Sequence, residues 1–281
     1  MTLKIRTHAF DWGKRTYLMG VLNVTPDSFS DGGEFNTLEA SLVQAHRLVE
    51  AGADILDIGG QSTRPGAEQI APEEEFNRVI PVIQEVRSHL DIPLSVDTTR
   101  ASVAQAAVEA GADLVNDISG GTFDPLMLPT VARLGVPIIL MHIRGTPQTM
   151  QQLTAYQDLV GEICCFLERQ IQSALDAGVA RSQIVIDPGI GFAKAAPQSL
   201  ELLRRLPELR RLNVPLLVGP SRKSFIGRVL NQENPKLRVW GTAAAIASAI
   251  AGGADIVRVH DVAEMSDVCR VADAIWRGQA S

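Results

Sequence analysis

The chain has 281 residues, of which 46% are hydrophobic and 21% are charged, and its formal net charge is −6. The negative charge argues against a nucleic-acid-binding surface, and no segment approaches the roughly 18 apolar residues of a membrane-spanning helix. We therefore expect neither a nucleic acid nor a membrane as partner, and this length is sufficient for one large core.

Three cysteines, Cys164, Cys165 and Cys269, give no disulfide pattern. The first two are adjacent, which is poor geometry for a disulfide bond, and no Cys-x-x-Cys motif is present. The first ten residues alternate charged with apolar side chains and lack the continuous apolar stretch of a signal peptide. These features predict a reducing, cytoplasmic location.

Short apolar segments alternate with helical patterns along the chain. The segments lie at 17–23, 54–58, 93–97, 113–117, 137–142, 184–187, 215–218 and 255–260. Segments that are apolar at almost every position are typical of parallel strands covered on both faces. Eight such strand–helix units predict an α/β fold, a (β/α)8 TIM barrel forming a single domain over residues 1–281. A doubly wound open sheet is the alternative, but the Gly-x-Gly-x-x-Gly turn expected after its first strand is missing.

Three of the predicted strand-to-helix connections are long, at 23–37, 59–72 and 142–155. Long loops at the carboxyl ends of barrel strands usually cover the active site. Catalytic residues of such barrels also come from these strand ends. Here the strand ends and the positions just after them carry polar side chains: Asn23, Asp57, Asp97, Asn116, Asp117, His142, Asp187, Ser221, Arg222, Lys223, Ser224, Arg258 and His260. Asp117, and Asp261 directly after His260, could instead each cap the helix that follows.

Four of these side chains predict a pocket for a flat nitrogen heterocycle. Asp97, Asn116, Asp187 and Lys223 would bring two carboxylates, one amide and one ammonium group to the barrel mouth. A 2-amino-4-oxo ring offers N–H donors to aspartate and an acceptor to asparagine or lysine. Lys223 could also be a solvated surface lysine or a Schiff-base lysine. Nearby carboxylates would keep it charged, which favours a binding role.

Strands 7 and 8 usually supply the phosphate site of a barrel. Arg258 and His260 end the last strand just before a predicted helix start, so they would hold a phosphate or pyrophosphate together with Ser221 and Arg222. The sequence has no cluster of His and Cys residues, so we expect no structural zinc site. Asn23 could complete a Mg²⁺ site made mainly of water and pyrophosphate oxygens. We therefore expect Mg²⁺ to bind only when a pyrophosphate compound is present.

Eight segments of the chain resemble the dihydropteroate synthase family. The two most distinctive are LMGVLNVTPDSFSDGG at 18–33 and AGADILDIGGQSTRPG at 51–66. The others are SVDTTR at 95–100, VNDISG at 115–120, LMHIRG at 140–145, IDPGIGFAK at 186–194, VGPSRKSFIG at 218–227 and IVRVHDV at 256–262. The resemblance covers essentially the whole chain.

The resemblance implies that 6-hydroxymethyl-7,8-dihydropterin pyrophosphate is joined to 4-aminobenzoate, releasing pyrophosphate and 7,8-dihydropteroate. It also implies a Mg²⁺ cofactor and a homodimer. The pterin and pyrophosphate residues would be Thr63, Asp97, Asn116, Asp187, Lys223, Arg258 and His260, with Asn23 as metal ligand. The aminobenzoate pocket would be Phe29, Thr63, Arg64, Pro65, Phe192 and Ser224. The catalytic set would be Asp31, Arg64, Asp97, Asp187 and Lys223.

One residue departs from the family pattern: Gln61 stands where the second signature more often has glutamate. The change removes a charge from the 59–72 loop. Two alternatives also remain open at this point, a methyltransferase-type pterin-binding barrel and a non-catalytic pterin-binding paralogue. A methyltransferase would have no need for Asn23, Arg258 and His260 as a pyrophosphate site, and a paralogue would be expected to have weakened loops.

Overall fold

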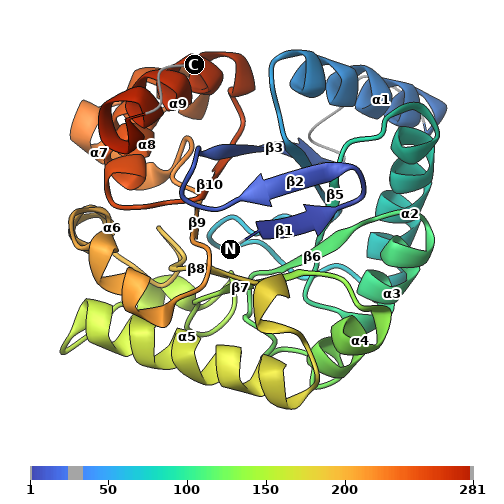
Figure 1. Cartoon of the computed structure of the whole chain (residues 1–281), viewed down its shortest axis with the longest axis horizontal. Helices are drawn as coiled ribbons and strands as arrows, with labels where there is room; N and C mark the ends of the chain where they lie inside the picture. Colours follow the sequence, from blue (N-terminus) through green and yellow to red (C-terminus); the bar gives the residue numbers. More distant parts are fainter. Residues whose placement is uncertain (1, 25–33, 279–281) are drawn as a thin grey trace.

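The computed structural model describes residues 2–24 and 34–278, and within them eight parallel strands form a closed barrel (Figure 1). The strand order is β8-β7-β6-β5-β4-β3-β10-β9. A parallel bridge between Ile186 and Leu216 joins the two end strands, so the sheet closes. The strands are β3 (Tyr17–Asn23), β4 (Ile55–Gly59), β5 (Leu94–Asp97), β6 (Leu114–Asp117), β7 (Ile138–Met141), β8 (Ile184–Asp187), β9 (Leu217–Val218) and β10 (Ile256–Val259). The predicted (β/α)8 fold class is confirmed, and the open doubly wound sheet is excluded.

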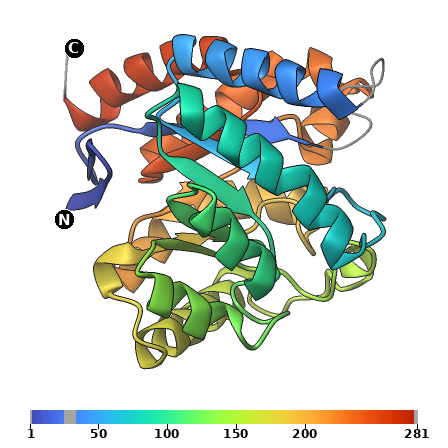
Figure 2. The same cartoon turned by 90° about the vertical axis from the view of Figure 1, so that its right-hand side faces the viewer.

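Helices surround the barrel, and neighbouring helices pack side by side, as Figure 2 shows for α1 and α2. The α-helices are α1 (Glu34–Glu50), α2 (Pro72–His89), α3 (Ala101–Glu109), α4 (Met127–Leu134), α5 (Leu159–Asp176), α6 (Ala196–Arg204), α7 (Ser224–Leu230), α8 (Val239–Ala251) and α9 (Val262–Arg277). Short 3₁₀ helices are η2 (Met150–Gln152), η3 (Arg181–Gln183), η4 (Leu206–Leu212) and η5 (Pro235–Leu237). No helix in the described ranges is long and apolar enough to cross a membrane.

The strands are apolar on both faces because each face has its own packing partner. Leu56, Val96 and Val115 point outward into one core cluster with helix residues such as Val79 and Ile83. Inward-pointing residues form a second, separate cluster inside the barrel: Met19, Ile55, Leu114, Ile139, Val185, Leu217 and Ile256. Since side chains alternate along a strand, this inner layer fixes which later residues also point inward.

A β-hairpin that the sequence patterns did not predict closes the amino end of the barrel. It consists of β1 (Thr2–Ile5) and β2 (His8–Asp11), which pair antiparallel. Leu3, Ile5 and Phe10 are buried against the inner apolar layer, and Figure 1 shows the hairpin lying across the barrel. The hairpin therefore covers apolar surface that an open barrel end would expose to water.

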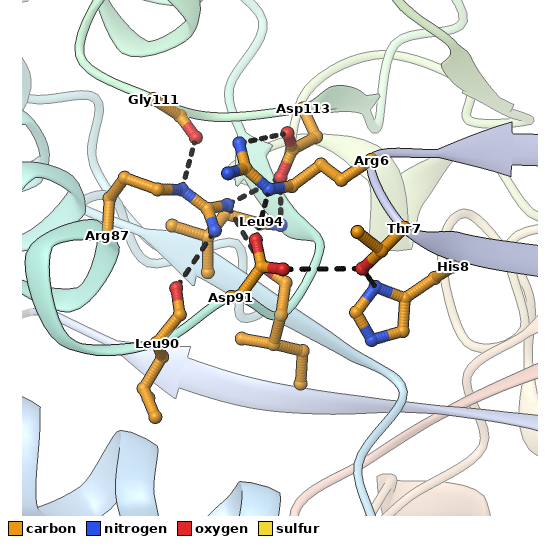
Figure 3. Close-up of polar contacts among 10 residues, drawn as sticks. Arg6, Thr7, His8, Arg87, Leu90, Asp91, Leu94, Gly111 and Asp113 are labelled. Carbon is orange, nitrogen blue, oxygen red and sulfur yellow. Dashed lines mark hydrogen bonds and ion pairs between the residues drawn. The ribbon is translucent and has the colours of Figure 1, made fainter.

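Charged side chains hold the hairpin turn against the barrel (Figure 3). Arg6, at the turn, donates from Nε to Asp91 Oδ1 at 2.7 Å. Its Nη1 lies 3.5 Å from Asp113 Oδ1, and Arg87 Nη2 donates to Asp113 Oδ2 at 2.5 Å. The same Asp113 oxygen accepts from the Leu94 backbone amide at 2.8 Å, which ties the cluster to the start of β5.

Candidate active site

Strand alternation places polar side chains directly above the inner apolar layer, at the carboxyl end of the barrel. Two residues after an inward apolar residue, four strands present a polar one: Ile55 precedes Asp57, Leu114 precedes Asn116, Val185 precedes Asp187, and Ile256 precedes Arg258. Asp97 follows Ser95 in the same way, and its Cα pairs with those of Gly59 and Asn116 on the neighbouring strands. Five of the predicted strand-end residues therefore lie in one polar layer: Asp57, Asp97, Asn116, Asp187 and Arg258.

Arg258 is the central cation of this layer. Its Nε donates to Asp57 Oδ2 at 2.6 Å, and its Nη2 donates to Asp97 Oδ2 at 2.9 Å. Asn116 Nδ2 donates to the same Asp57 oxygen at 3.1 Å. Arg258 was predicted as a pyrophosphate ligand, and in this structure its guanidinium lies against these two carboxylates.

Burial changes the proton affinity of the two predicted pterin carboxyl groups. Burial, followed by the nearby Asp57 charge, raises the pKa of Asp97 to about 7, although Arg258 opposes the shift. Burial also raises the pKa of Asp187, against the opposing charge of Lys223. A carboxylate with so little water around it interacts strongly with any charge that develops beside it.

Lys223 lies at the start of α7, and its ammonium group donates to the Ile190 carbonyl. Its Nζ is 4.6 Å from the centre of the Phe192 ring, a distance at which these two predicted site residues form a cation–π contact. Burial lowers the pKa of Lys223 to about 8, with Asp187 opposing the shift. The predicted charged state therefore still dominates at neutral pH, while burial is a stronger influence than the sequence suggested.

The end of β10 and the loop after β9 meet at His260. Ser221 Oγ lies 3.0 Å from His260 Nδ1 and accepts from the His260 backbone amide at 3.2 Å. Burial, followed by the charges of Arg258 and Arg222, lowers the pKa of His260 to about 3, so its imidazole is neutral. Arg222 pairs with Asp261 through Nε at 2.9 Å and through a second contact from Nη2.

The predicted loop residues are only partly brought to the site. Thr63 and Gln61 line a small pocket with Asp97. Arg64 and Pro65 are exposed, and the positive charge of Arg64 is near enough to lower the pKa of His260 slightly. Ser224 is exposed beside Lys223. Phe29 and Asp31 lie outside the described residues.

The donor set does not build a resident metal site within the described part of the chain. There, no group of three or more His, Cys, Asp or Glu residues could hold an ion. Asn23 ends β3 beside Gly59 and offers one hard amide oxygen at the mouth. One amide oxygen suits Mg²⁺ only when water and substrate oxygens complete the coordination.

Two proposed helix caps have other roles. Asp117 accepts from Ser119 and Gly121 backbone amides at 2.7 and 2.9 Å, so it stabilises the turn after β6. Asp261 precedes α9 without a capping hydrogen bond and pairs with Arg222 instead.

The sequence patterns did not single out two buried residues of this site. Asp57 was noted only as a strand end, although its spacing from the inward Ile55 signals its orientation. Lys194 is buried beneath the loop after β8, where its Nζ lies 3.0 Å from His142 Nδ1. No spacing or periodicity distinguishes such a lysine from a solvated one, because only the folded loop covers it.

The chain is similar in sequence and in fold to several known proteins. Residues 19–260 match the model of the family described as pterin binding enzyme. A dihydropteroate synthase of Synechocystis sp. is 64% identical over 268 residues, covering 95% of this chain and 93% of the relative. The Xanthomonas albilineans dihydropteroate synthase with 4-aminobenzoic acid has a TM-score of 0.89 and 45% identity, covering 95% of this chain and 94% of the other. The same organism's enzyme in complex with 7,8-dihydropteroate has a TM-score of 0.88 and 42% identity, covering 98% of both chains.

Proposed function

The chain belongs to the pterin-binding enzymes and, within them, to the dihydropteroate synthases, and on this basis we propose how its residues carry out the reaction. It is a transferase of folate biosynthesis that joins 6-hydroxymethyl-7,8-dihydropterin pyrophosphate to 4-aminobenzoate. The match over 95% of the chain is to a synthase, which sets aside the methyltransferase-type and non-catalytic alternatives. The observation that carries the residue assignment is the inward-facing polar layer at the barrel mouth.

We infer that Asp97, Asn116, Asp187 and Lys223 bind the dihydropterin ring. Carboxylates accept hydrogen bonds from ring N–H groups, and the lysine ammonium donates to a ring acceptor. Ionised carboxylates are the better acceptors, so ring binding would release protons where the pKa of Asp97 has been raised. Arg258 would stay paired with Asp57 while the ring occupies the space above it.

Departure of pyrophosphate from the exocyclic CH₂ group leaves a cation that the electron-rich dihydropterin delocalises. Asp97 and Asp187 would stabilise that positive charge, which is an electrostatic contribution of the kind that often dominates catalysis. The aromatic amine of aminobenzoate then forms the new C–N bond and loses one proton. An aniline nitrogen needs no strong base, so the site requires no Ser-His-Asp constellation.

On the leaving-group side, we assign Arg258, the neutral His260 and Asn23. His260 would donate a hydrogen bond from its imidazole, with Nδ1 facing Ser221. Mg²⁺, held by Asn23 together with water and pyrophosphate oxygens, would neutralise the negative charge that develops on the leaving group. Binding of the metal is thereby coupled to binding of the pyrophosphate substrate.

For the second substrate, we propose a pocket of Thr63, Arg64, Pro65, Phe192 and Ser224, with Phe29 and Asp31 contributed by the preceding loop. Aminobenzoate would bind only after the pyrophosphate substrate, because that substrate orders the loops that complete the pocket. Calorimetric titration of aminobenzoate with and without inorganic pyrophosphate and Mg²⁺ checks this order. Equal affinity in both titrations would contradict it.

We also propose a homodimer and a cytoplasmic location. An apolar groove of about 560 Å³ runs between α6, α7 and α8, and Leu200, Val229 and Leu230 line it with side chains that are partly exposed. The adjacent Trp240 is 78% exposed. Apolar surface of this extent is typical of an interface, and a second copy of the chain fits the expectation of a dimer. The three cysteines are unpaired, as a reducing compartment favours.

Product formation from the two substrates tests the proposed function. The purified protein, supplied with dihydropterin pyrophosphate, 4-aminobenzoate and Mg²⁺, should form 7,8-dihydropteroate, detected by chromatography. Asp187→Asn should lower kcat/KM by about 100-fold or more because it removes a carboxylate charge that would stabilise the cationic transition state. Asp117→Asn is the matched control, since this equally buried aspartate faces its own turn. Absence of product from well-folded protein would reject the proposal.

A further inference from the structure

Lys194 is a buried lysine to which the reaction assigns no role. Only 3% of the residue is exposed, and it lies in the loop between β8 and α6. Lysine is almost never buried this deeply without a charged partner. In the described part of the chain, Lys194 forms no ion pair with a carboxylate within 4.0 Å.

The Lys194 amino group bridges two neutral partners instead. Its Nζ donates to the Phe192 carbonyl at 2.8 Å and lies 3.0 Å from His142 Nδ1. Burial lowers the pKa of His142 to about 2, so this imidazole carries no charge. Burial also lowers the pKa of Lys194 well below its usual value, although the more distant charge of Asp187 opposes the shift.

His142 is a firm support for this bridge. Its backbone amide donates to the Asp187 carbonyl at 2.9 Å, which continues the pairing of β7 with β8. Its ring packs edge-on against Phe166, with the ring centres 4.9 Å apart. Lys194 therefore connects the 188–195 loop to the end of β7, which belongs to the rigid barrel wall.

The loop segment that Lys194 supports presents Phe192 to the site. The Phe192 amide donates to the Gly189 carbonyl at 3.0 Å, closing a turn over 189–192. At the first end of this turn, the Gly189 amide donates to Asp187 Oδ1 at 2.7 Å. The Phe192 end is held at its carbonyl by Lys194. The two ends of one turn thus have separate anchors, one in the pterin layer and one on Lys194.

We propose that Lys194 is a positioning residue that fixes the Phe192 wall of the aminobenzoate pocket through the bridge from the Phe192 carbonyl to His142. This inference rests on the proposed assignment of Phe192 to that pocket. An apolar side chain would fill the same space without the cost of burying an amine. The buried amine donates a hydrogen bond to the Phe192 carbonyl. Placement of the Phe192 backbone is therefore the function that explains why a lysine is buried at this position.

Lys194→Met tests the proposal because methionine keeps the length of the side chain and removes the amine. The KM for aminobenzoate should rise about tenfold, as expected for one buried carbonyl left without its donor. The KM for the pterin pyrophosphate should change less than about threefold, because the Gly189 end of the turn keeps its anchor on Asp187. Tyr156→Phe is the matched control: it removes a 3.0 Å hydrogen bond to the neighbouring Ala193 carbonyl and leaves the Phe192 carbonyl with its donor, so it should raise the KM for aminobenzoate less than Lys194→Met does.

Hydrogen exchange of the 188–196 peptide gives a readout independent of activity, so it separates this inference from the proposed function. Exchange in this peptide should be faster in Lys194→Met than in Tyr156→Phe, with the barrel strands unchanged. If Lys194→Met does not fold, His142→Phe removes the other partner of the bridge and should produce the same pattern. Unchanged exchange, or a parallel rise of both KM values, would overturn the assignment.

Discussion

Among the residues of the polar layer, Asp57 is the one whose substitution should lower the free energy of unfolding most clearly. It is fully buried, and its Oδ2 accepts from both Arg258 and Asn116. Asp57→Asn keeps the shape and removes the charge, which leaves a buried guanidinium short of one partner. Breaking a buried ion pair in this way costs roughly 3–5 kcal/mol. Arg258 keeps Asp97 at 2.9 Å, so we expect the lower end, about 3 kcal/mol.

Urea unfolding measures this cost through the midpoint, provided that the slope of the transition is unchanged. A double-mutant cycle with Arg258→Met then isolates the pair, and we expect a coupling energy of about 1–3 kcal/mol. Asp117→Asn combined with Arg258→Met is the control, because Asp117 bonds its own turn and should add independently. Coupling below about 0.5 kcal/mol between Asp57 and Arg258 would refute the reasoning.

Three further predictions concern charge, metal and assembly. Because the folded pKa of Asp97 is raised to about 7 from 3.8, its contribution to stability is present at low pH and is lost as the pH rises through 7. Urea unfolding at pH 4.5 and 7.5 measures the free energy of unfolding of Asp97→Asn relative to that of the parent, and this difference should favour the variant more at pH 7.5. An equal difference at both pH values would contradict this. Asn23→Ala should raise the Mg²⁺ concentration for half-maximal activity, while calorimetry should detect no tight Mg²⁺ binding to the bare parent protein. If the proposed homodimer forms through the groove beside Trp240, Trp240→Glu should lower the mass measured by light-scattering chromatography to that of a monomer, and an unaltered mass would contradict this interface.

The amino-acid sequence was sufficient for the barrel and for most of the polar layer. Apolar segments of strand length that alternate with helical patterns, several of them directly after a glycine or proline that ends the preceding helix, are local signals, and eight of them leave few possible folds. Asp97, Asn116 and Asp187 could be placed because strand ends converge at one rim of a barrel. The segments that resemble dihydropteroate synthases added the identity of the substrates.

Other features were decided only by tertiary structure, because they depend on which distant residues meet. The partners of Arg258 come from β4 and β5, which lie 201 and 161 positions earlier in the chain. The low pKa of His260 and the raised pKa of Asp97 result from burial, which no local pattern contains. Lys194 reads as an ordinary solvated lysine until the folded 188–195 loop covers it. Sequence alone thus determined the layer in which the chemistry lies, and folding decided the charge and the partners of each group within it.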